Sequence, residues 1–361
     1  MKSTLKFTSK FFNKPKHSTI AGSYMESLFS TEGRFSLESV SDQHDLSYEQ
    51  VHHFISDSCS WDEEDLNNRR LQFLNNHKFM QTLPSGILIL DDTQAIKNGT
   101  HTDGVAYQHC GSTGRSENCV AFVTSHYTDD HKDFPHKATT YYPDDESKID
   151  LACHLIDDFY RSGLNASHVT FDIWYSCQQV IRIVEEHKRF FVSKIKLNRV
   201  IFYRGKRLDV RSLVTASSAT GACFDKKVTF KGMGRYRLIV SGGEVYISND
   251  FASTTEQIIG IYHKRWIIDQ SYHALKDKLN LDSFQVRKPV LILRHIYLVF
   301  LAYTYYTWAQ TKHIFHKVYQ GAISKLSDMC KVIKNLSIFQ KAKMQINDLL
   351  SLLHLKPNLQ V

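Results

Sequence analysis

Three aspartates, Asp92, Asp172 and Asp269, occupy positions from which their carboxylates could act together. Asp92 ends a continuous apolar run that begins at Ile87, and Asp172 ends a second run that begins at Val169. Hard divalent cations take oxygen ligands, and Mg²⁺ is usually held by one or two carboxylates together with waters and phosphate oxygens. The three carboxylates therefore suit a pair of Mg²⁺ or Mn²⁺ ions that clamp a phosphodiester during an in-line displacement.

Cationic side chains surround the third aspartate on one predicted helix. On a helical wheel of about 100° per residue, four residues share one narrow face: Tyr262, Arg265, Asp269 and Lys276. Arg forks onto phosphate and Lys acts as a point charge, so this face suits a phosphodiester better than a sugar or a peptide. The spacing of Arg265 and Asp269 alone is equally typical of an ordinary amphipathic helix. The chemical interpretation therefore depends on the three carboxylates meeting in space.

The elements that would position these residues alternate between apolar strands and amphipathic helices. The two continuous apolar runs predict central strands that are covered on both faces. The resulting order of elements indicates a mixed α/β fold. The predicted strands are 87–90, 120–125, 169–171 and 190–195, and the predicted helices between them are 148–162 and 178–187.

Segments with other residue patterns precede, interrupt and follow this core. Capping boxes at Ser47 and Ser60 predict two short helices in a small N-terminal helical module with a basic arm, which serves either DNA binding or packing. The third aspartate lies on one long predicted helix from Thr254 to Leu279. We expect residues 1–80 to form the helical module, 81–196 the first part of the catalytic core, 197–250 a β-rich insertion, 251–310 the third-acid helix and the helix after it, and 311–361 a basic helical tail.

Composition narrows the class of protein. The chain has 361 residues with 42% hydrophobic side chains, which excludes a disordered or collagen-like chain and predicts one large domain with appendages. Its 45 Lys and Arg against 37 Asp and Glu give a net charge of +8, which favours a polyanionic partner. Seven cysteines without a CxxC pair predict reduced thiols in the cytoplasm.

One apolar stretch, 290–309, approaches the length of a membrane span. Arg294 and His295 interrupt it, so we expect a buried helix and no membrane partner.

The joint pattern resembles a known family. The spacing Tyr262-x2-Arg265-x3-Asp269-x6-Lys276 is similar to the tyrosine, arginine, glutamate, lysine signature of bacterial DDE insertion-sequence transposases. Residues 87–93 and 169–175 resemble the strands that carry their first and second aspartates, and the β-rich stretch before Tyr262 resembles their insertion. The resemblance covers roughly residues 36 to 300.

This resemblance implies an RNase H-like mixed sheet flanked by helices, with two Mg²⁺ or Mn²⁺ ions held by Asp92, Asp172 and Asp269 as the catalytic acids. It implies a transposase that cleaves and joins double-stranded DNA at terminal inverted repeats and in the target, as a homodimer in a bacterial, nucleoid-associated setting. In that family the signature Tyr, Arg and Lys contact end DNA. Those roles would fall to Tyr262, Arg265 and Lys276.

The chain departs from the family at the third acid. Asp269 stands where the family has glutamate, one methylene and about 1.5 Å shorter in reach. A catalytically weakened or silent DNA-binding relative is therefore the alternative. Either Asp91 or Asp92 could be the first acid. Neighbouring strand residues face opposite sides of a sheet, so only one of the two can point into the site.

Four further features or interpretations carry less weight. A zinc site would draw on His101, His109, Cys110 and Cys119, but these lack the paired spacing of structural zinc sites. A glycosidase with paired carboxylates does not need the cationic face. The tryptophans that follow the second and third acids, Trp174 and Trp266, are expected to pack in the core rather than stack on bases. The Lys-rich stretch from Lys312 to Lys343 either contacts phosphate or forms a solvated helix face.

Overall fold

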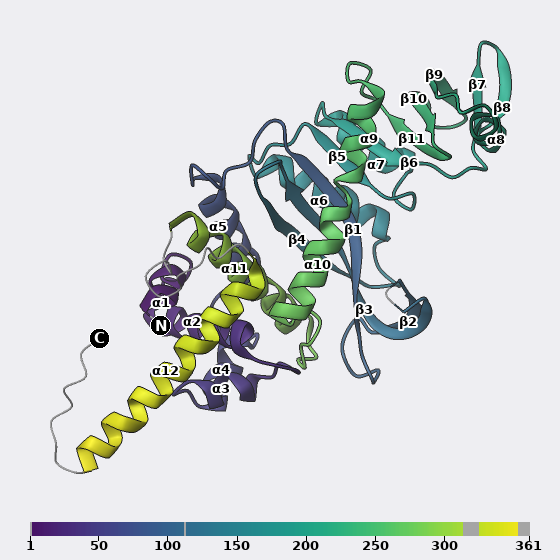
Figure 1. The fold of residues 1–361 in the computed structure, drawn as a ribbon. Helices are drawn as coiled ribbons and strands as arrows, with labels where there is room; N and C mark the ends of the chain where they lie inside the picture. Colours follow the sequence, from purple (N-terminus) through teal and green to yellow (C-terminus); the bar gives the residue numbers. More distant parts are fainter. Residues whose placement is uncertain (1, 112, 313–324, 353–361) are drawn as a thin grey trace. The chain divides into compact units, whose positions relative to one another are not determined.

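The computed structural model describes residues 2–111, 113–312 and 325–352 (Figure 1). The chain forms two compact units. A helical unit comprises Met1–Leu66, Ala274–Gln285 and Val290–Val361, and a sheet unit comprises Asn67–His273 and Val286–Pro289. The three predicted acids all belong to the sheet unit.

The helical unit begins with helices whose apolar side chains are buried. The first two dozen residues are not a basic arm, because Phe7, Ile20 and Tyr24 are almost completely buried within helices or beside them. The helices of this part are α1 (Lys2–Thr8), α2 (Pro15–Ser30), α3 (Leu37–Gln43), α4 (Tyr48–Ile55) and the start of α5 (Glu63–Asn75). The predicted capping box at Ser47 and Gln50 is confirmed. The capping box predicted at Ser60 is wrong. Helix α5 is capped by Asp62 instead, whose carboxylate accepts the N–H of Asp65 at 2.8 Å.

The C-terminal part of the helical unit consists of two long helices, α11 (Pro289–Lys312) and α12 (Leu326–Leu352). Helix α11 is long and apolar enough to cross a membrane by length and composition, yet 83% of its most apolar window is buried inside the protein. Arg294 within it is only 4% exposed, and its guanidinium donates to the carbonyl groups of Ser56, Cys59 and Trp61. These bonds satisfy a charged group on a buried helix. Within the predicted basic tail, residues 313–324 lie outside the described residues, as do the side chains of Lys312, Lys341 and Lys343.

The sheet unit is built on one mixed sheet of eleven strands. Its strands are β1 (Ile87–Ile96), β2 (Ala106–Cys110), β3 (Arg115–Thr128), β4 (Asp133–Tyr141), β5 (His168–Phe171), β6 (Phe190–Lys194), β7 (Val200–Tyr203), β8 (Lys206–Asp209), β9 (Phe224–Phe230), β10 (Gly234–Ser241) and β11 (Glu244–Ser248). The central order is β4-β3-β1-β5-β6, with β1, β5 and β6 parallel and β3 antiparallel to β1. This mixed α/β arrangement is consistent with the predicted RNase H-like fold.

Two helices accompany the central strands. Helix α6 (Lys148–Arg161) begins at a capping box formed by Ser147 and Asp150, and it buries an apolar face that includes Leu155 and Phe159. Helix α7 (Gln178–Glu186) follows β5 and buries Val180, Ile181 and Val184. Both helices and both buried strands agree with the periodicity of the sequence.

The helix predicted from Thr254 to Leu279 is broken in the structure. It consists of α9 (Thr255–His263) and α10 (Trp266–Leu279). At the junction the N–H groups of Arg265, Ile267 and Ile268 donate to carbonyls three residues earlier. Such tighter turns advance the chain by about 120° per residue, so a helical wheel of about 100° does not hold across the junction.

The insertion extends the sheet beyond β6 through β11, β10, β9, β7 and β8. It is β-rich as expected, but it also contains a helix that the sequence pattern did not indicate, α8 (Val210–Thr220). This helix begins at Asp209, whose side chain accepts the N–H of Arg211, and ends at Gly221 in the left-handed region with φ 68°. Glycine adopts that conformation without a Cβ penalty, which explains the helix end.

Candidate active site

Strand β5 ends beside the middle of β1, and this brings two carboxylates side by side. The parallel register pairs Leu90 with Phe171, so Asp91 and Asp172 are the next residues on the two strands. Residues paired in a parallel register face the same side of the sheet. Asp91 rather than Asp92 therefore shares a face with Asp172.

Arg265 joins this face to the third acid. Its Nη1 lies 2.5 Å from Oδ2 of Asp91, and its Nη2 lies 3.5 Å from Oδ2 of Asp269. The side chains of Arg265 and Asp91 are 19% and 16% exposed, whereas that of Asp269 is 40% exposed. One guanidinium thus bridges a carboxylate on β1 and a carboxylate on α10 at a partly solvent-accessible position.

Asp92 points to the opposite face of β1. Its Oδ2 lies 2.6 Å from the ammonium of Lys148, the first residue of α6. The same ammonium lies 5.2 Å from the ring centre of Tyr141. Because Asp91 meets the start of α10 and Asp92 meets α6, these two helices cover opposite faces of the sheet.

Asp172 is held by the backbone that follows it. Its Oδ1 accepts the N–H groups of Trp174 at 2.8 Å and of Tyr175 at 3.3 Å. The hydroxyl of Ser193 on β6 donates to the Asp172 carbonyl at 3.2 Å. These bonds fix one carboxylate oxygen, whereas the second has no hydrogen-bond partner among the described residues.

The carboxylates act on one another electrostatically. The pKa of Asp91 is raised to about 7, chiefly by burial; the guanidinium of Arg265 opposes the rise, and the charges of Asp172 and Asp269 add to it. Burial also raises the pKa of Asp172 and that of Asp269 above the ordinary value, again against the influence of Arg265. The site thus concentrates negative charge that a single Arg compensates incompletely.

Helix α10 is fixed against β3 and β4 next to Asp269. The hydroxyl of Ser271 donates to Oδ2 of Asp133 at 2.9 Å, and the same oxygen lies 2.9 Å from Nε2 of the fully buried His126. Just before α10, the ammonium of Lys264 forms an ion pair with Asp130. These contacts hold the helix that presents Asp269.

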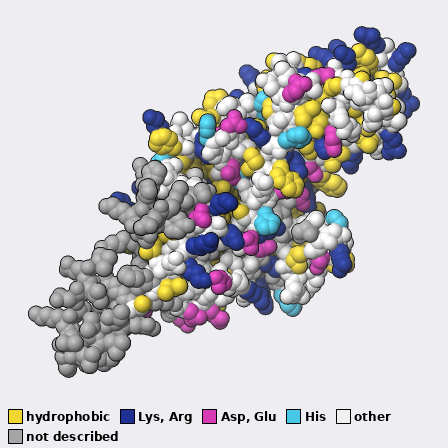
Figure 2. Space-filling model, in the orientation of Figure 1, with side chains coloured by type: hydrophobic (Ala, Val, Ile, Leu, Met, Phe, Trp, Pro, Cys, Tyr) yellow, Lys and Arg dark blue, Asp and Glu magenta, His cyan; other side chains and the backbone are white. Residues whose placement is uncertain are grey.

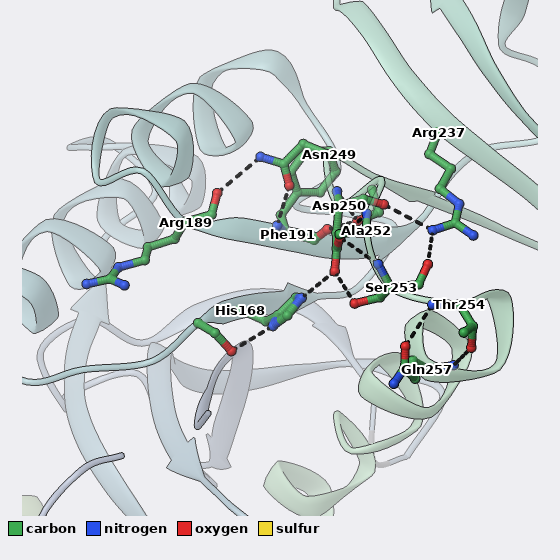
Figure 3. A network of polar contacts seen from close by, with 12 residues as sticks. His168, Arg189, Phe191, Arg237, Asn249, Asp250, Ala252, Ser253, Thr254 and Gln257 are labelled. Carbon is green, nitrogen blue, oxygen red and sulfur yellow. Dashed lines mark hydrogen bonds and ion pairs between the residues drawn. The ribbon is translucent and has the colours of Figure 1, made fainter. Parts of the chain in front are cut away.

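A second polar network anchors α9, the helix that leads to Arg265. Figure 3 shows Asp250 at its centre. Oδ1 of Asp250 accepts the N–H groups of Ala252 and Ser253, and Oδ2 accepts the Ser253 hydroxyl. Nε2 of His168 lies 3.2 Å from the same Oδ2. Arg237 donates to the carbonyls of Asp250 and Ser253. Since His168 begins β5, the network connects the strand of the second acid to the start of α9.

The predicted DNA-contacting residues lie in three different settings. The ring of Tyr262 is 8% exposed, belongs to an apolar cluster with Ile239 and Tyr246, and has the Lys194 ammonium 5.6 Å from its centre. Arg265 lies at the acids, as described above. Lys276 lies about two turns beyond Asp269 on α10, in the part of that helix assigned to the helical unit.

The expectation that the two tryptophans pack in the core is wrong. Trp174 and Trp266 are each 61% exposed. Trp174 follows the second acid by two residues, and its ring lies 5.7 Å from the ammonium of Lys196. Trp266 directly follows Arg265. Large aromatic rings therefore border the acids on the solvent side.

Two residues at the site carried no signal in the sequence. Lys148 was only a helix position, and its contact with Asp92 depends on how α6 packs on β1. Tyr175 is completely buried, its hydroxyl has no hydrogen-bond partner among the described residues, and Asp92, Asp91 and Asp172 all raise its pKa in addition to burial. Apolar periodicity does not distinguish such a tyrosine from an ordinary core residue.

The acids do not form a closed set of metal ligands. Among residues 2–111, 113–312 and 325–352, no group of three or more His, Cys, Asp or Glu side chains is arranged to hold a metal ion. The donor chemistry nevertheless suits a hard cation, because Asp91, Asp172 and Asp269 supply carboxylate oxygens only.

The sheet unit thus combines a mixed sheet, two neighbouring carboxylates on β1 and after β5, and a third carboxylate on a covering helix. Residues 9–213, more than half of the chain, match the family described as DDE superfamily endonuclease, and the chain belongs to that family. Membership of the family agrees with the fold predicted from the sequence. DDE endonucleases generally use divalent metal ions.

One curated relative is the probable transposase for insertion sequence element IS701 of Microchaete diplosiphon, 28% identical over 163 residues. The match spans 42% of this chain and 41% of that relative. Among solved structures, Ciona intestinalis endonuclease V in complex with a 23mer DNA matches 60% of this chain and 88% of its own at 10% identity, with a TM-score of 0.28. The Drosophila P element transposase strand transfer complex matches 85% of this chain and 92% of its own at 9% identity, with a TM-score of 0.18.

Proposed function

We propose that this protein is the DNA transposase of an insertion sequence, which cleaves DNA at terminal inverted repeats and joins the freed ends to target DNA. The observation that carries the proposal is the register of β1 and β5, which places Asp91 beside Asp172 on the face where Arg265 meets Asp269. Family membership supports the same conclusion. So does the spacing of residues 262–276, which resembles the transposase signature.

Asp91 takes the role of the first acid in this proposal. The sequence alone favoured Asp92, but Asp92 faces α6 and is neutralised by Lys148 at 2.6 Å. Asp91 experiences the charges of both Asp172 and Asp269, while the charge of Asp92 acts on Asp172. We assign Asp92 and Lys148 to positioning β1, and we assign Asp91, Asp172 and Asp269 to catalysis.

The same three carboxylates would hold two Mg²⁺ or Mn²⁺ ions. Two features of the site support the fit: the donors are all hard oxygens, and the guanidinium of Arg265 is one positive charge beside three carboxylates. A bound pair of ions would activate the attacking oxygen and stabilise the leaving one in an in-line displacement.

Arg265 and Lys276 would contact the phosphates of the DNA ends, as the family signature implies. Tyr262 would act through Arg265, because its ring is buried and the guanidinium is near enough to lower the pKa of the Tyr262 hydroxyl against the effect of burial. Arg presents a planar fork that suits phosphate, so Arg265 would exchange part of its carboxylate contact for a DNA phosphate. Assembly as a homodimer on paired DNA ends, without a membrane partner, completes the proposal.

A matched pair of variants tests the assignment. The duplex substrate carries the inverted repeats that flank the coding sequence, and cleavage is followed on a gel with and without Mg²⁺. Asp91→Asn and Asp172→Asn should each abolish Mg²⁺-dependent cleavage while the protein still retards the duplex. Asp92→Asn should keep measurable cleavage. Full cleavage by Asp91→Asn would refute the role of Asp91, and full cleavage by Asp172→Asn would refute the nuclease itself.

A second candidate function is favoured by Asp269, which stands where the transposase signature has glutamate. A shorter side chain that is 40% exposed and lies 3.5 Å from Arg265 reaches less far toward Asp91 and Asp172. A DNA-binding relative without cleavage activity would show the binding of the proposed enzyme and no cut product with either metal.

A further inference from the structure

The positive charge of this protein is concentrated in its insertion. Residues 197–250 contain ten Lys and Arg against four Asp and Glu, a net charge of +6. The whole chain has 45 Lys and Arg against 37 Asp and Glu, so the remaining residues contain 35 against 33 and carry a net charge of only +2. Most of the excess of cations seen in the composition therefore belongs to one structural element.

The strand register arranges part of this charge in a line across the insertion sheet. Arg207 pairs with Phe202, Phe202 with Thr229, and Thr229 with Arg235. Directly paired residues of neighbouring strands face the same side of a sheet. All four side chains are exposed, so they form one row across β8, β7, β9 and β10 on the solvent side. Three strand spacings separate the two arginines, roughly 14 Å.

More cations lie on and beside this row. Lys227 is two residues before Thr229 on β9, faces the same side, and lies 4.5 Å from the ring centre of the exposed Phe251. Arg204 and Lys206 are exposed at the turn between β7 and β8. Figure 2 shows Lys and Arg side chains gathered at the end of the molecule where Figure 1 places β7, β8 and β9.

The acids of the insertion do not neutralise the row. Asp225 is engaged by the Arg237 guanidinium at 2.6 Å, and Glu244 forms an ion pair with Lys194. Asp209 caps helix α8. Within the described residues, neither Arg207 nor Arg235 takes part in an ion pair.

We propose that the exposed face made of Phe202, Arg207, Lys227, Thr229 and Arg235, here called the insertion row, docks the phosphate backbone of duplex DNA. Two arginines roughly 14 Å apart can contact phosphates on both sides of a major groove about 12 Å wide. Phe202 between them offers an apolar surface to sugars, and Thr229 offers a hydroxyl to phosphate. The choice of DNA as the polyanion rests on the proposed function, whereas the existence of the surface does not.

This docking surface is separate from the acids. The row lies on β10, β9, β7 and β8, which are three to six strands away from β5, the strand that Asp172 follows. Its contacts would be with backbone only, so it would bind duplexes of different sequence with similar affinity. We therefore assign to the insertion row the sequence-independent part of DNA binding, such as engagement of DNA flanking the ends or of target DNA.

The test uses the full-length protein with a fluorescein-labelled duplex of arbitrary sequence, in EDTA so that no cleavage occurs. The triple variant Arg207→Gln, Lys227→Gln, Arg235→Gln should bind at least about tenfold more weakly near physiological salt. Each lost phosphate contact removes about 0.9 from the slope of log K against log salt, so the slope should flatten by about 2.7. A circular dichroism melt confirms that the variant is folded.

Two controls keep the result specific. The variant Arg115→Gln, Arg161→Gln, Arg182→Gln removes the same charge from exposed positions elsewhere in the sheet unit and should bind as the original protein does. The charge-preserving variant Arg207→Lys, Lys227→Arg, Arg235→Lys should restore the original slope. An unchanged slope in the Gln triple variant, or an equal loss in the first control, overturns the proposal.

The partner is tested separately. Competition with RNA of equal length should displace the labelled duplex no better than unlabelled duplex DNA does. Stronger displacement by RNA would show that the insertion row prefers RNA to duplex DNA, and it would overturn the proposal. Binding is measured without metal, so it does not depend on cleavage. Failure of the cleavage test at Asp91 and Asp172 would refute the proposed enzyme but would not change the result for the insertion row.

Discussion

The guanidinium of Arg265 lies 2.5 Å from the carboxylate of Asp91, although the two residues are 174 positions apart in the chain. The same guanidinium reaches Asp269 one helical turn further on, at 3.5 Å. Arg265 is therefore the local countercharge for two of the three proposed catalytic acids, and it stands at the junction where α9 gives way to α10. Its removal would leave carboxylates facing one another without compensation.

Arg265→Gln should consequently lower the free energy of unfolding at pH 8. Breaking a largely buried ion pair costs about 3–5 kcal/mol, and the partial exposure of this site should reduce the loss to about 1–3 kcal/mol. Arg265→Lys keeps the charge and should recover part of it. Urea denaturation in EDTA measures both values. Equal stability of the Gln variant and the original protein would show that Arg265 does not balance the acids.

Stability should also depend on pH through Asp91. Its pKa is raised to about 7 in the folded protein, from an ordinary value near 4, so the folded state holds a proton that the unfolded state releases between those values. The free energy of unfolding therefore decreases as pH rises from about 4 to 7. Asp91→Asn removes this contribution and should stabilise the metal-free protein at pH 8 by about 2 kcal/mol, with little effect at pH 4.

The control for this titration is Asp92→Asn, which changes the neighbouring carboxylate on the opposite face. It breaks the ion pair with Lys148, so it should not stabilise the protein at pH 8. Stabilisation by the Asp92 variant and not by the Asp91 variant would reverse the assignment of the two acids.

The sequence predicted the strands of the core but not the choice between neighbouring acids. The apolar runs ending at Leu90 and Phe171 identify the strands because buried parallel strands need apolar residues on both faces. Which acid faces the site depends on the pairing of Leu90 with Phe171, and no local pattern contains that pairing. The register had to come from the structure.

The third-acid helix shows a second limit of sequence interpretation. Its periodicity is unbroken from Thr254 onward, so a single helix was the natural prediction. The break follows from tertiary contacts: Tyr262 is drawn into an apolar cluster with Tyr246, and Arg265 turns to Asp91. The exposure of Trp174 and Trp266 was missed for the same reason, because residue type alone favours burial of large aromatic side chains.

The exposed tryptophans predict a fluorescence signal at the site. Trp61 is 8% exposed, whereas Trp174 and Trp266 are each 61% exposed. Acrylamide should therefore quench the emission of Trp174 and Trp266 preferentially, and the double variant Trp174→Phe, Trp266→Phe should lose most of the quenchable emission. If the double variant is quenched as strongly as the original protein, the two rings are not exposed in solution.

The network around Asp250 predicts a stability effect far from the acids. Asp250 is 2% exposed and accepts four hydrogen bonds from Ala252, Ser253 and His168. Asp250→Asn replaces acceptor capacity with donors and should cost about 2–4 kcal/mol in the free energy of unfolding. The exposed Asp144→Asn serves as the matched control and should change stability by less than about 0.5 kcal/mol. Equal melting curves for the two variants would contradict the anchoring role of the network.

The decisive prediction concerns the length of the third acid. Asp269→Glu extends the carboxylate by about 1.5 Å from a position that is 40% exposed, so the fold should tolerate it with a stability change below about 0.5 kcal/mol. If the short side chain limits the reaction, Mg²⁺-dependent cleavage should rise by about tenfold or more, equivalent to about 1.4 kcal/mol in the barrier. Asp269→Asn, which keeps the length of the aspartate and removes its charge, should not cleave. A glutamate variant that cleaves more slowly than the original protein would show that this site is adapted to aspartate and that the enzyme is not weakened by it.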